Sequence, residues 1–213
     1  MPSRVTRTAP QFQRIVKPYR DAFMILIASE GQKTEELYFS FPFLSHRRVK
    51  ILPIPSQDGC SAPAYVLDNL KNTAKQLDLG KQDRLWLAID RDRWKEQQIR
   101  EVMGKKIRNI PIKVALSNPC FELWLYLHFA PMPAEPMQSS QEMESKLRTV
   151  KGSYSKTSLK AEEFEPGLVN AMEEAEKTST DSDGIPNNPG THVHRILKEI
   201  KDLKTKEDGI PCT

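Results

Sequence analysis

Four short apolar runs, each followed by a segment with helical character, constrain the fold of this 213-residue chain more than any other feature. Each run has the length and composition of a buried strand, and the segments between them place apolar residues at helical spacing. Strands that are joined through helices pair in parallel by right-handed crossovers. We therefore expect an α/β fold with an open, parallel, four-stranded sheet and flanking helices, its strands at residues 22–29, 49–54, 84–89 and 112–116.

The chain divides into three parts by composition. Residues 1–20 carry three prolines, five basic groups and no acid, and we expect a basic N-terminal arm. Residues 21–130 hold the strand–helix alternation of the α/β domain. A proline-rich stretch begins at residue 131, so residues 131–213 are expected to form a mainly helical C-terminal extension, with helices near 140–150, 160–177 and 191–204.

Carboxylates follow three of the four runs where each leaves the predicted sheet. Glu30 ends the first run, Asp90 and Asp92 end the third, Glu122 opens the helix after the fourth, and Glu35 lies in the first turn of the first helix. Because the carboxyl ends of parallel strands share one edge, these side chains converge if their strands are neighbours. Crowded carboxylates repel unless a cation joins them, and hard oxygen ligands favour Mg²⁺ or Mn²⁺. The sequence therefore predicts a site for one of these metals.

Each of these acids also has a purely structural interpretation. Asp-x-Asp commonly forms a solvated turn, Glu35 suits the positive end of a helix dipole, and Glu122 suits a core acid paired with an arginine. Trp94 either packs in the core, braces the acidic turn or stacks on a base. The functional interpretation gains its weight because three of the four strand ends deliver an acid to one edge.

The composition argues against several other classes of protein. No apolar run approaches the ~20 residues of a membrane span, and the N-terminus lacks the apolar region of a signal peptide, so we expect a cytoplasmic protein that does not bind membranes. The three cysteines and four histidines do not have the spacing of a zinc site, and Cys120 is expected to be a buried thiol. No phosphate-binding loop of the ATPase type is present, so ATP hydrolysis would have to come from another protein.

Basic residues gather in local stretches of a chain whose formal net charge is only +4. Such stretches either form ordinary solubilising surface or contact a polyanion such as nucleic acid. Two groups of candidates follow: Lys33, Arg91, Arg93 and Lys156 for charge on a phosphate, and Arg91, Arg93, Lys151, Lys156 and Lys160 for contact with a nucleic-acid backbone.

Three motifs, EGQKTEELYF (30–39), DRDRW (90–94) and SNPCFELWLYLHF (117–129), resemble the RloB-like family, and KGSYSK (151–156) and NNPGTHVHRIL (187–197) fit its pattern more loosely. A glutamate after the first strand and Asp-x-Asp after a later one also resemble the Toprim domain of topoisomerases, bacterial primases and OLD-type nucleases. RloB-like proteins are found beside restriction–modification genes and in AbiL-type abortive-infection systems, usually next to a partner ATPase. The resemblance thus implies a Toprim-like domain over residues 21–130.

The resemblance also implies roles for individual residues. Glu30 matches the Toprim glutamate, a metal ligand or general base, and Asp90 and Asp92 match the metal ligands of Asp-x-Asp. Glu35 matches the second acid of the OLD-type pattern, although it lies one residue later than in those nucleases. Glu122 has no place in the minimal Toprim motif, and its role depends on the RloB-like segment and on the edge argument.

These observations lead to one expected function and two alternatives. We expect a Mg²⁺-dependent phosphoryl-transfer enzyme, a nuclease acting on DNA or RNA in a phage-defence system, with a separate ATPase subunit as partner. Glu30, Asp90 and Asp92 would be catalytic, with Lys33 and Lys156 as the cations that face the phosphate. The alternatives are nucleotidyl transfer to a tRNA or nucleotide, and a non-catalytic subunit that binds nucleic acid or the ATPase. Assembly into a homo-oligomer is left open.

Overall fold

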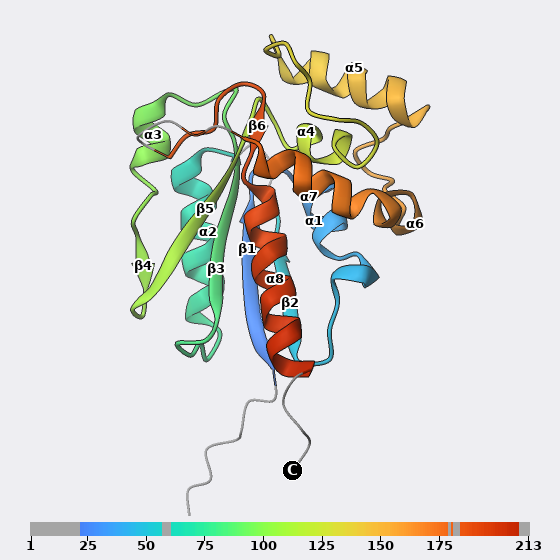
Figure 1. The fold of residues 1–213 in the computed structure, drawn as a ribbon. Coiled ribbons are helices and arrows are strands. Elements are labelled where there is room, and N and C mark those ends of the chain that lie inside the picture. The colour runs from blue at the N-terminus through green and yellow to red at the C-terminus, as the bar shows by residue number, and fades with distance from the viewer. Residues whose placement is uncertain (1–21, 57–60, 179, 181–183, 209–213) are drawn as a thin grey trace, which may run out of the picture.

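The computed structural model describes residues 22–56, 61–178, 180 and 184–208, so the predicted basic arm at 1–20 lies outside the described residues. The chain alternates strands and helices as far as the fourth strand, continues directly into the fifth, and is mainly helical after it (Figure 1). The elements are β1 (Phe23–Ser29), α1 (Thr34–Phe39), the 3-10 helix η1 (Pro42–Leu44), β2 (Val49–Ile54), α2 (Pro63–Lys75), β3 (Arg84–Asp90), α3 (Glu96–Arg100), β4 (Lys106–Ile107), β5 (Ile110–Asn118), α4 (Glu122–Tyr126), α5 (Ser140–Lys151), α6 (Ala161–Phe164), the 3-10 helix η2 (Glu165–Gly167), α7 (Leu168–Glu176), β6 (Gly190–Thr191) and α8 (Val193–Asp208).

The sheet is mixed and mostly parallel. Its strands lie in the order β2-β1-β3-β5-β4, and β6 pairs with β5. The four predicted strands are confirmed as β1, β2, β3 and β5, and all neighbours among them are parallel. The prediction of a purely parallel, four-stranded sheet was wrong, because β4 and β6 add two short antiparallel strands.

The two additional strands have different origins. β4 and β5 form a hairpin whose connecting residues, Arg108 and Asn109, both have positive φ, at 48° and 66°. This is the backbone of the two-residue turns whose twist matches that of the paired strands. β6 comes from the C-terminal region, where Gly190 and Thr191 pair with Asn118 and Ser117 at the carboxyl end of β5. Residues after 131 therefore contribute a strand to the same sheet.

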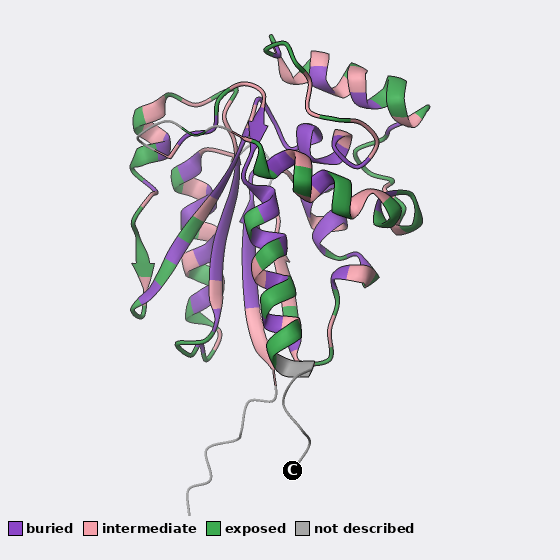
Figure 2. Ribbon diagram, in the orientation of Figure 1, coloured by how far each residue is buried: buried purple, intermediate pink, exposed green. Residues whose placement is uncertain are grey.

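A hydrophobic core lies on each face of the sheet. On one face, side chains of α2 and α3 pack against alternate residues of β1, β3 and β5, such as Leu26, Leu87 and Ile112. On the other face, α1, α4, α7 and α8 cover the intervening residues, such as Ile27 and Trp86. Buried residues accordingly fill the centre of the sheet, while the outer surfaces of α8 and α5 are exposed (Figure 2). Strands buried on both faces explain why the sequence shows continuous apolar runs and no alternation.

Two helical segments are short or interrupted. The helix after Asp-x-Asp is only the five residues of α3. The helix expected over 160–177 is interrupted between α6 and α7 at Pro166 and Gly167. Proline cannot donate the helical hydrogen bond, and a Cβ on Gly167 would lie 1.9 Å from the carbonyl oxygen of His128, so only glycine fits this close approach. No helix of the described part of the chain is long and apolar enough to cross a bilayer.

Candidate functional site: an acidic cavity at the carboxyl edge of the sheet

The strand order brings the predicted acids to one place. β1 and β3 are neighbours, and the Glu30 amide continues their ladder by donating to the carbonyl oxygen of Ala88 at 3.1 Å. Glu30 therefore leaves β1 beside Asp90, the last residue of β3. A cavity of about 340 Å³ opens at this edge. All five predicted acids line it, and its walls comprise Glu30, Gly31, Gln32, Lys33, Thr34, Glu35, Ser61, Asp90, Asp92, Arg93, Cys120, Phe121, Glu122, Ser140, Lys156 and Thr157.

The Asp-x-Asp turn is fixed to the end of the neighbouring strand. The Arg91 amide donates to the carbonyl oxygens of Ser117 at 2.8 Å and of Pro119 at 3.1 Å, and the Asp92 amide also donates to Pro119 at 3.1 Å. The Asp90 carboxylate accepts a hydrogen bond from the amide of Phe121 at 2.9 Å. These hydrogen bonds with backbone groups hold both aspartates at the edge of the sheet.

Trp94 holds Glu30. Its indole Nε1 donates to Glu30 Oε2 at 2.9 Å, and the Asp90 amide donates to the same oxygen at 3.3 Å. Glu30 Oε1 receives no hydrogen bond from the described residues. The Trp94 ring also packs against the core formed by α2 and α3. Two of the interpretations that the sequence left open for Trp94 therefore apply at once. Its ring packs against the core, and its indole N–H braces the acidic turn.

Glu35 is buried beneath the turn that follows β1. Its side chain is part of a residue only 4% exposed, and its Oε1 accepts from the Gly31 amide at 3.0 Å. A Cβ at position 31 would lie 2.0 Å from Glu35 Oε2, so glycine leaves the space that this carboxyl group fills. Because Glu35 lies in the first turn of α1, directly after the turn that follows Glu30, its side chain lies under that turn.

The C-terminal region reaches back to Glu122. Its Oε1 accepts a hydrogen bond from the Tyr154 hydroxyl at 3.1 Å and lies 3.1 Å from Lys156 Nζ. Lys156 Nζ also lies 3.3 Å from Glu144 Oε2, and the Thr34 hydroxyl donates to the Lys156 carbonyl oxygen at 3.2 Å. The sequence pointed to Lys156 but not to Tyr154 or Glu144. Tyr154 could have been found, because it belongs to the KGSYSK motif. Glu144 could not, because it has the pattern of an ordinary charged residue on a helix surface.

Crowding of these acids shifts their protonation. Burial raises the pKa of Glu30 to about 7, although the donors from Trp94 and Asp90 act in the opposite direction. Burial also raises the pKa of Glu35 to about 7. The pKa of Asp90 lies well above its ordinary value, first because of burial and then because of the charges on Glu35 and Glu30. Full ionisation of this cluster is therefore unfavourable unless positive charge enters the cavity.

The chemistry of the donor set suits a hard divalent cation. All five acids supply oxygen ligands of the kind that Mg²⁺ and Mn²⁺ prefer. As the side chains lie, no group of three or more His, Cys, Asp or Glu residues in the described part of the chain could hold a metal ion. Each carboxylate instead accepts from a protein donor, including the Ser140 hydroxyl on Asp92 Oδ2. A metal at this edge would use the other oxygen of each carboxylate or would exchange with these donors.

Three of the predicted cations line the cavity. The Lys33 side chain is 63% exposed and lies 3.7 Å from Glu36, outside the acidic cluster. The Arg93 side chain is 65% exposed, with Nε 4.0 Å from Asp92 Oδ1. Lys156 is the third. A phosphate group entering the cavity would meet these cations at its rim.

The other predicted nucleic-acid contacts do not line the cavity. Arg91 Nη1 donates to the carbonyl oxygen of Trp94 at 2.6 Å and so braces the same turn from within. Lys151 Nζ lies 2.7 Å from Glu163, and its side chain is only 7% exposed. Lys160 is exposed and immediately precedes α6.

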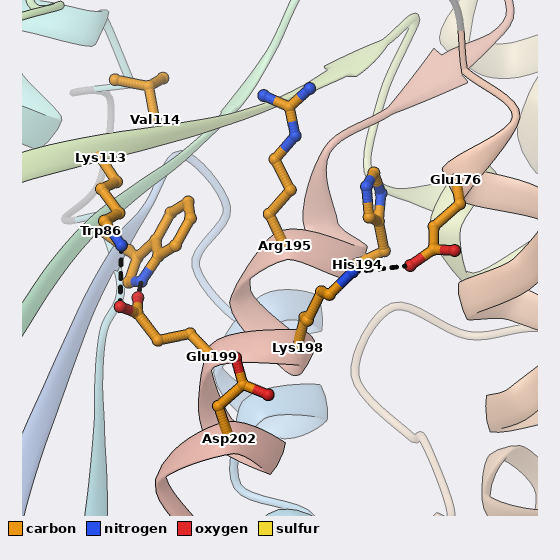
Figure 3. Close-up of a pocket in the computed structure, with 9 residues that line it drawn as sticks. All are labelled: Trp86, Lys113, Val114, Glu176, His194, Arg195, Lys198, Glu199 and Asp202. Carbon is orange, nitrogen blue, oxygen red and sulfur yellow. Dashed lines mark hydrogen bonds and ion pairs between the residues drawn. The ribbon is translucent and has the colours of Figure 1, made fainter.

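A second hollow, of about 750 Å³, is larger but carries paired charges. It lies between α8 and the face of β3 and β5, and Figure 3 shows its lining of Trp86, Lys113, Val114, Glu176, His194, Arg195, Lys198, Glu199 and Asp202. Glu199 accepts from Trp86 Nε1 at 2.7 Å and Lys113 Nζ at 2.8 Å, and it also pairs with Arg84. Lys198 lies 3.4 Å from Glu176. The contacts of Glu199 attach α8 to the sheet and the Lys198–Glu176 pair attaches it to α7, and we assign this hollow a structural role.

Comparisons with known proteins agree with the resemblance found in the sequence motifs. Comparison with curated proteins gave no significant match, and comparison with solved structures gave none either. The family model described as RloB-like protein matches residues 25–200. That range contains all five acids of the cavity as well as Tyr154 and Lys156. The chain therefore belongs to the RloB-like protein family.

Proposed function

We propose that this protein is a Mg²⁺- or Mn²⁺-dependent phosphoryl-transfer enzyme, a nuclease acting on DNA or RNA. The observation that carries the proposal is the convergence of five carboxylates from three strand ends on one cavity, with exposed cations at its rim. A bound divalent ion would supply Lewis-acid stabilisation of phosphate oxygens and would activate a water molecule as nucleophile. Asp90 and Asp92 would hold the ion, with Glu35 and Glu122 completing the oxygen ligands.

The remaining residues have roles that follow from their contacts. Glu30 Oε2 is fixed by two donors, so Oε1 is the oxygen that would accept a proton from the attacking water. Burial raises the pKa of Glu30, which makes its carboxylate a better proton acceptor than an exposed one. Lys33, Arg93 and Lys156 would donate to the phosphate oxygens on which charge develops. Lys160, exposed beyond the cavity, would contact the nucleic-acid backbone.

The biological setting of the proposal depends on the family. RloB-like family membership supports a role in phage defence, in an abortive-infection or restriction-linked system, together with a separate ATPase subunit. One observation favours a second candidate, a non-catalytic subunit that binds nucleic acid or the ATPase: each carboxylate already has a donor within the protein. Nucleotidyl transfer to a tRNA or nucleotide would use the same groups as the nuclease.

The experiment that separates these candidates measures cleavage of DNA and RNA, including tRNA, in Mg²⁺, Mn²⁺ or EDTA. The critical variant is Asp90→Asn, which keeps an oxygen for the Phe121 amide but removes the charge. Loss of a metal ligand costs several kcal/mol of transition-state stabilisation, so we expect cleavage to fall by about a hundredfold or more. Asp68→Asn, at an ion pair on the outer surface of α2, is the matched control and should cleave normally. Cleavage that persists in EDTA or in Asp90→Asn would refute the proposal.

A further inference from the structure

Lys156 occupies a position between a cavity acid and a second acid outside the cavity. Its Nζ lies 3.1 Å from Glu122 Oε1 and 3.3 Å from Glu144 Oε2. The Lys156 side chain is 52% exposed, whereas that of Glu122 is 7% exposed, so the ammonium group reaches inward from solvent to a buried carboxylate. Glu144 belongs to α5 and does not line the cavity. Lys156 is thus the one cation of the described cavity lining whose ammonium contacts a buried carboxylate of the cluster.

The contacts of Glu122 show how this ammonium group offsets the negative charge of the cluster. Both the Tyr154 hydroxyl and the Lys156 ammonium approach Oε1 of Glu122. Part of the negative charge of the cluster is therefore neutralised by the chain itself. A divalent ion that uses Glu122 as a ligand has to share or displace this ammonium group, because two cations at one carboxylate repel each other.

We propose that Lys156 is a built-in counter-ion that competes with the divalent cation for Glu122, and that Glu144 holds its ammonium group when the cation binds. This inference rests on the metal-dependent function proposed above. Glu144 makes the exchange possible because it already contacts Nζ: on losing Glu122, the ammonium group keeps a carboxylate partner and stays at the rim. It is then available to a phosphate oxygen. Tyr154 keeps Glu122 in place during the exchange.

If Lys156 competes with the cation, removing its charge should change the affinity for the cation and the rate of cleavage in opposite directions. Removing its charge should tighten binding of the cation, because Glu122 is then free. The same change should slow cleavage, because a donor to the phosphate is lost. A lysine that merely stabilises the local fold would weaken binding when removed, and a lysine that only contacts the phosphate would leave binding of the metal alone unchanged.

The test is calorimetric titration of the metal-free, full-length protein with Mn²⁺ alone, at pH 7.5 and moderate salt. A unit charge a few ångströms away, screened by solvent, changes the affinity for a divalent ion by roughly fivefold to tenfold, and we expect Lys156→Met to bind Mn²⁺ tighter by this factor. Lys71→Met is the matched control, since it removes the same charge from an exposed ion pair with Asp68 on α2, away from the cavity. We expect a change of less than about twofold for this control.

Glu144→Gln provides a second, independent measurement. Lys156 then has only Glu122 as its partner, so Mn²⁺ should bind roughly twofold to fivefold more weakly, and this effect should vanish in the Lys156→Met background. Equal or weaker Mn²⁺ binding by Lys156→Met, or an undiminished Glu144→Gln effect in that background, would overturn the inference while leaving the proposed function intact. A wild-type protein that binds no Mn²⁺ would overturn both.

Discussion

Glu35→Gln should stabilise the metal-free protein, and by an amount that grows with pH. The pKa of this buried acid is raised from 4.5 to about 7, and at ~1.36 kcal/mol per unit the rise corresponds to about 3 kcal/mol. The unfolded chain releases this proton near pH 4.5 and the folded protein near pH 7, so the folded state binds more protons between these values. Stability contributed by the neutral carboxyl group is therefore complete below pH 4.5 and is lost as the pH rises through 7. Glutamine keeps the neutral form at every pH, and its oxygen can still accept from the Gly31 amide.

The measurement is urea unfolding of wild type and Glu35→Gln in EDTA at several pH values from 5 to 8. The free energy of unfolding of the variant should exceed that of wild type by less than ~1 kcal/mol at pH 5 and by about 3 kcal/mol at pH 8. Taking the difference between the two proteins cancels the titration of distant groups, such as buried His128. Glu173→Gln, at an exposed position on α7, is the control and should match wild type throughout. A Glu35→Gln protein that is no more stable than wild type at pH 8 would refute the argument that an uncompensated buried charge sits beneath this turn.

Two further substitutions test the contacts around the acidic turn. Trp94→Phe keeps most of the ring packing but removes the donor to Glu30 Oε2. We expect the cleavage rate, measured by kinetics, to fall by about tenfold, and the free energy of unfolding, measured in urea, to fall by less than ~2 kcal/mol. A normal cleavage rate would contradict the bracing role of Trp94. Gly31→Ala places a Cβ on the Glu35 carboxyl group and should destabilise the protein by roughly 1–3 kcal/mol. That cost should largely disappear when Glu35 is also replaced by alanine, and equal costs in both backgrounds in urea unfolding would show that the close approach has another cause.

The central strands and their acids could be predicted because the signal for each is local. A strand buried on both faces gives a continuous apolar run, and the parallel order that follows from strand–helix alternation fixes which ends share an edge. Glu30 was expected to meet Asp90 and Asp92 if their strands are neighbours, and β1 and β3 are neighbours in the sheet.

The missed features depend on contacts between distant parts of the chain. β6 has only two residues, too few to show any period, and exists because Gly190 and Thr191 meet the end of β5. The role of Glu144 could not be predicted from its own helix, because its partner Lys156 belongs to a loop that returns to the cavity. The shortness of α3 and α4 was likewise hidden, because apolar residues next to a short helix contribute to the same periodic pattern as residues within it.

The return of the C-terminal region to the sheet has a consequence for synthesis of the protein. A ribosome-bound chain that has emerged only as far as α4 already contains all five acids of the cavity. It still lacks Tyr154, Lys156 and the strand that closes the sheet at the end of β5. Pairings between such distant residues form late. The lining of the cavity is thus complete only after residue 157 has been translated, and shorter nascent chains would be without the groups that hold Glu122 in place.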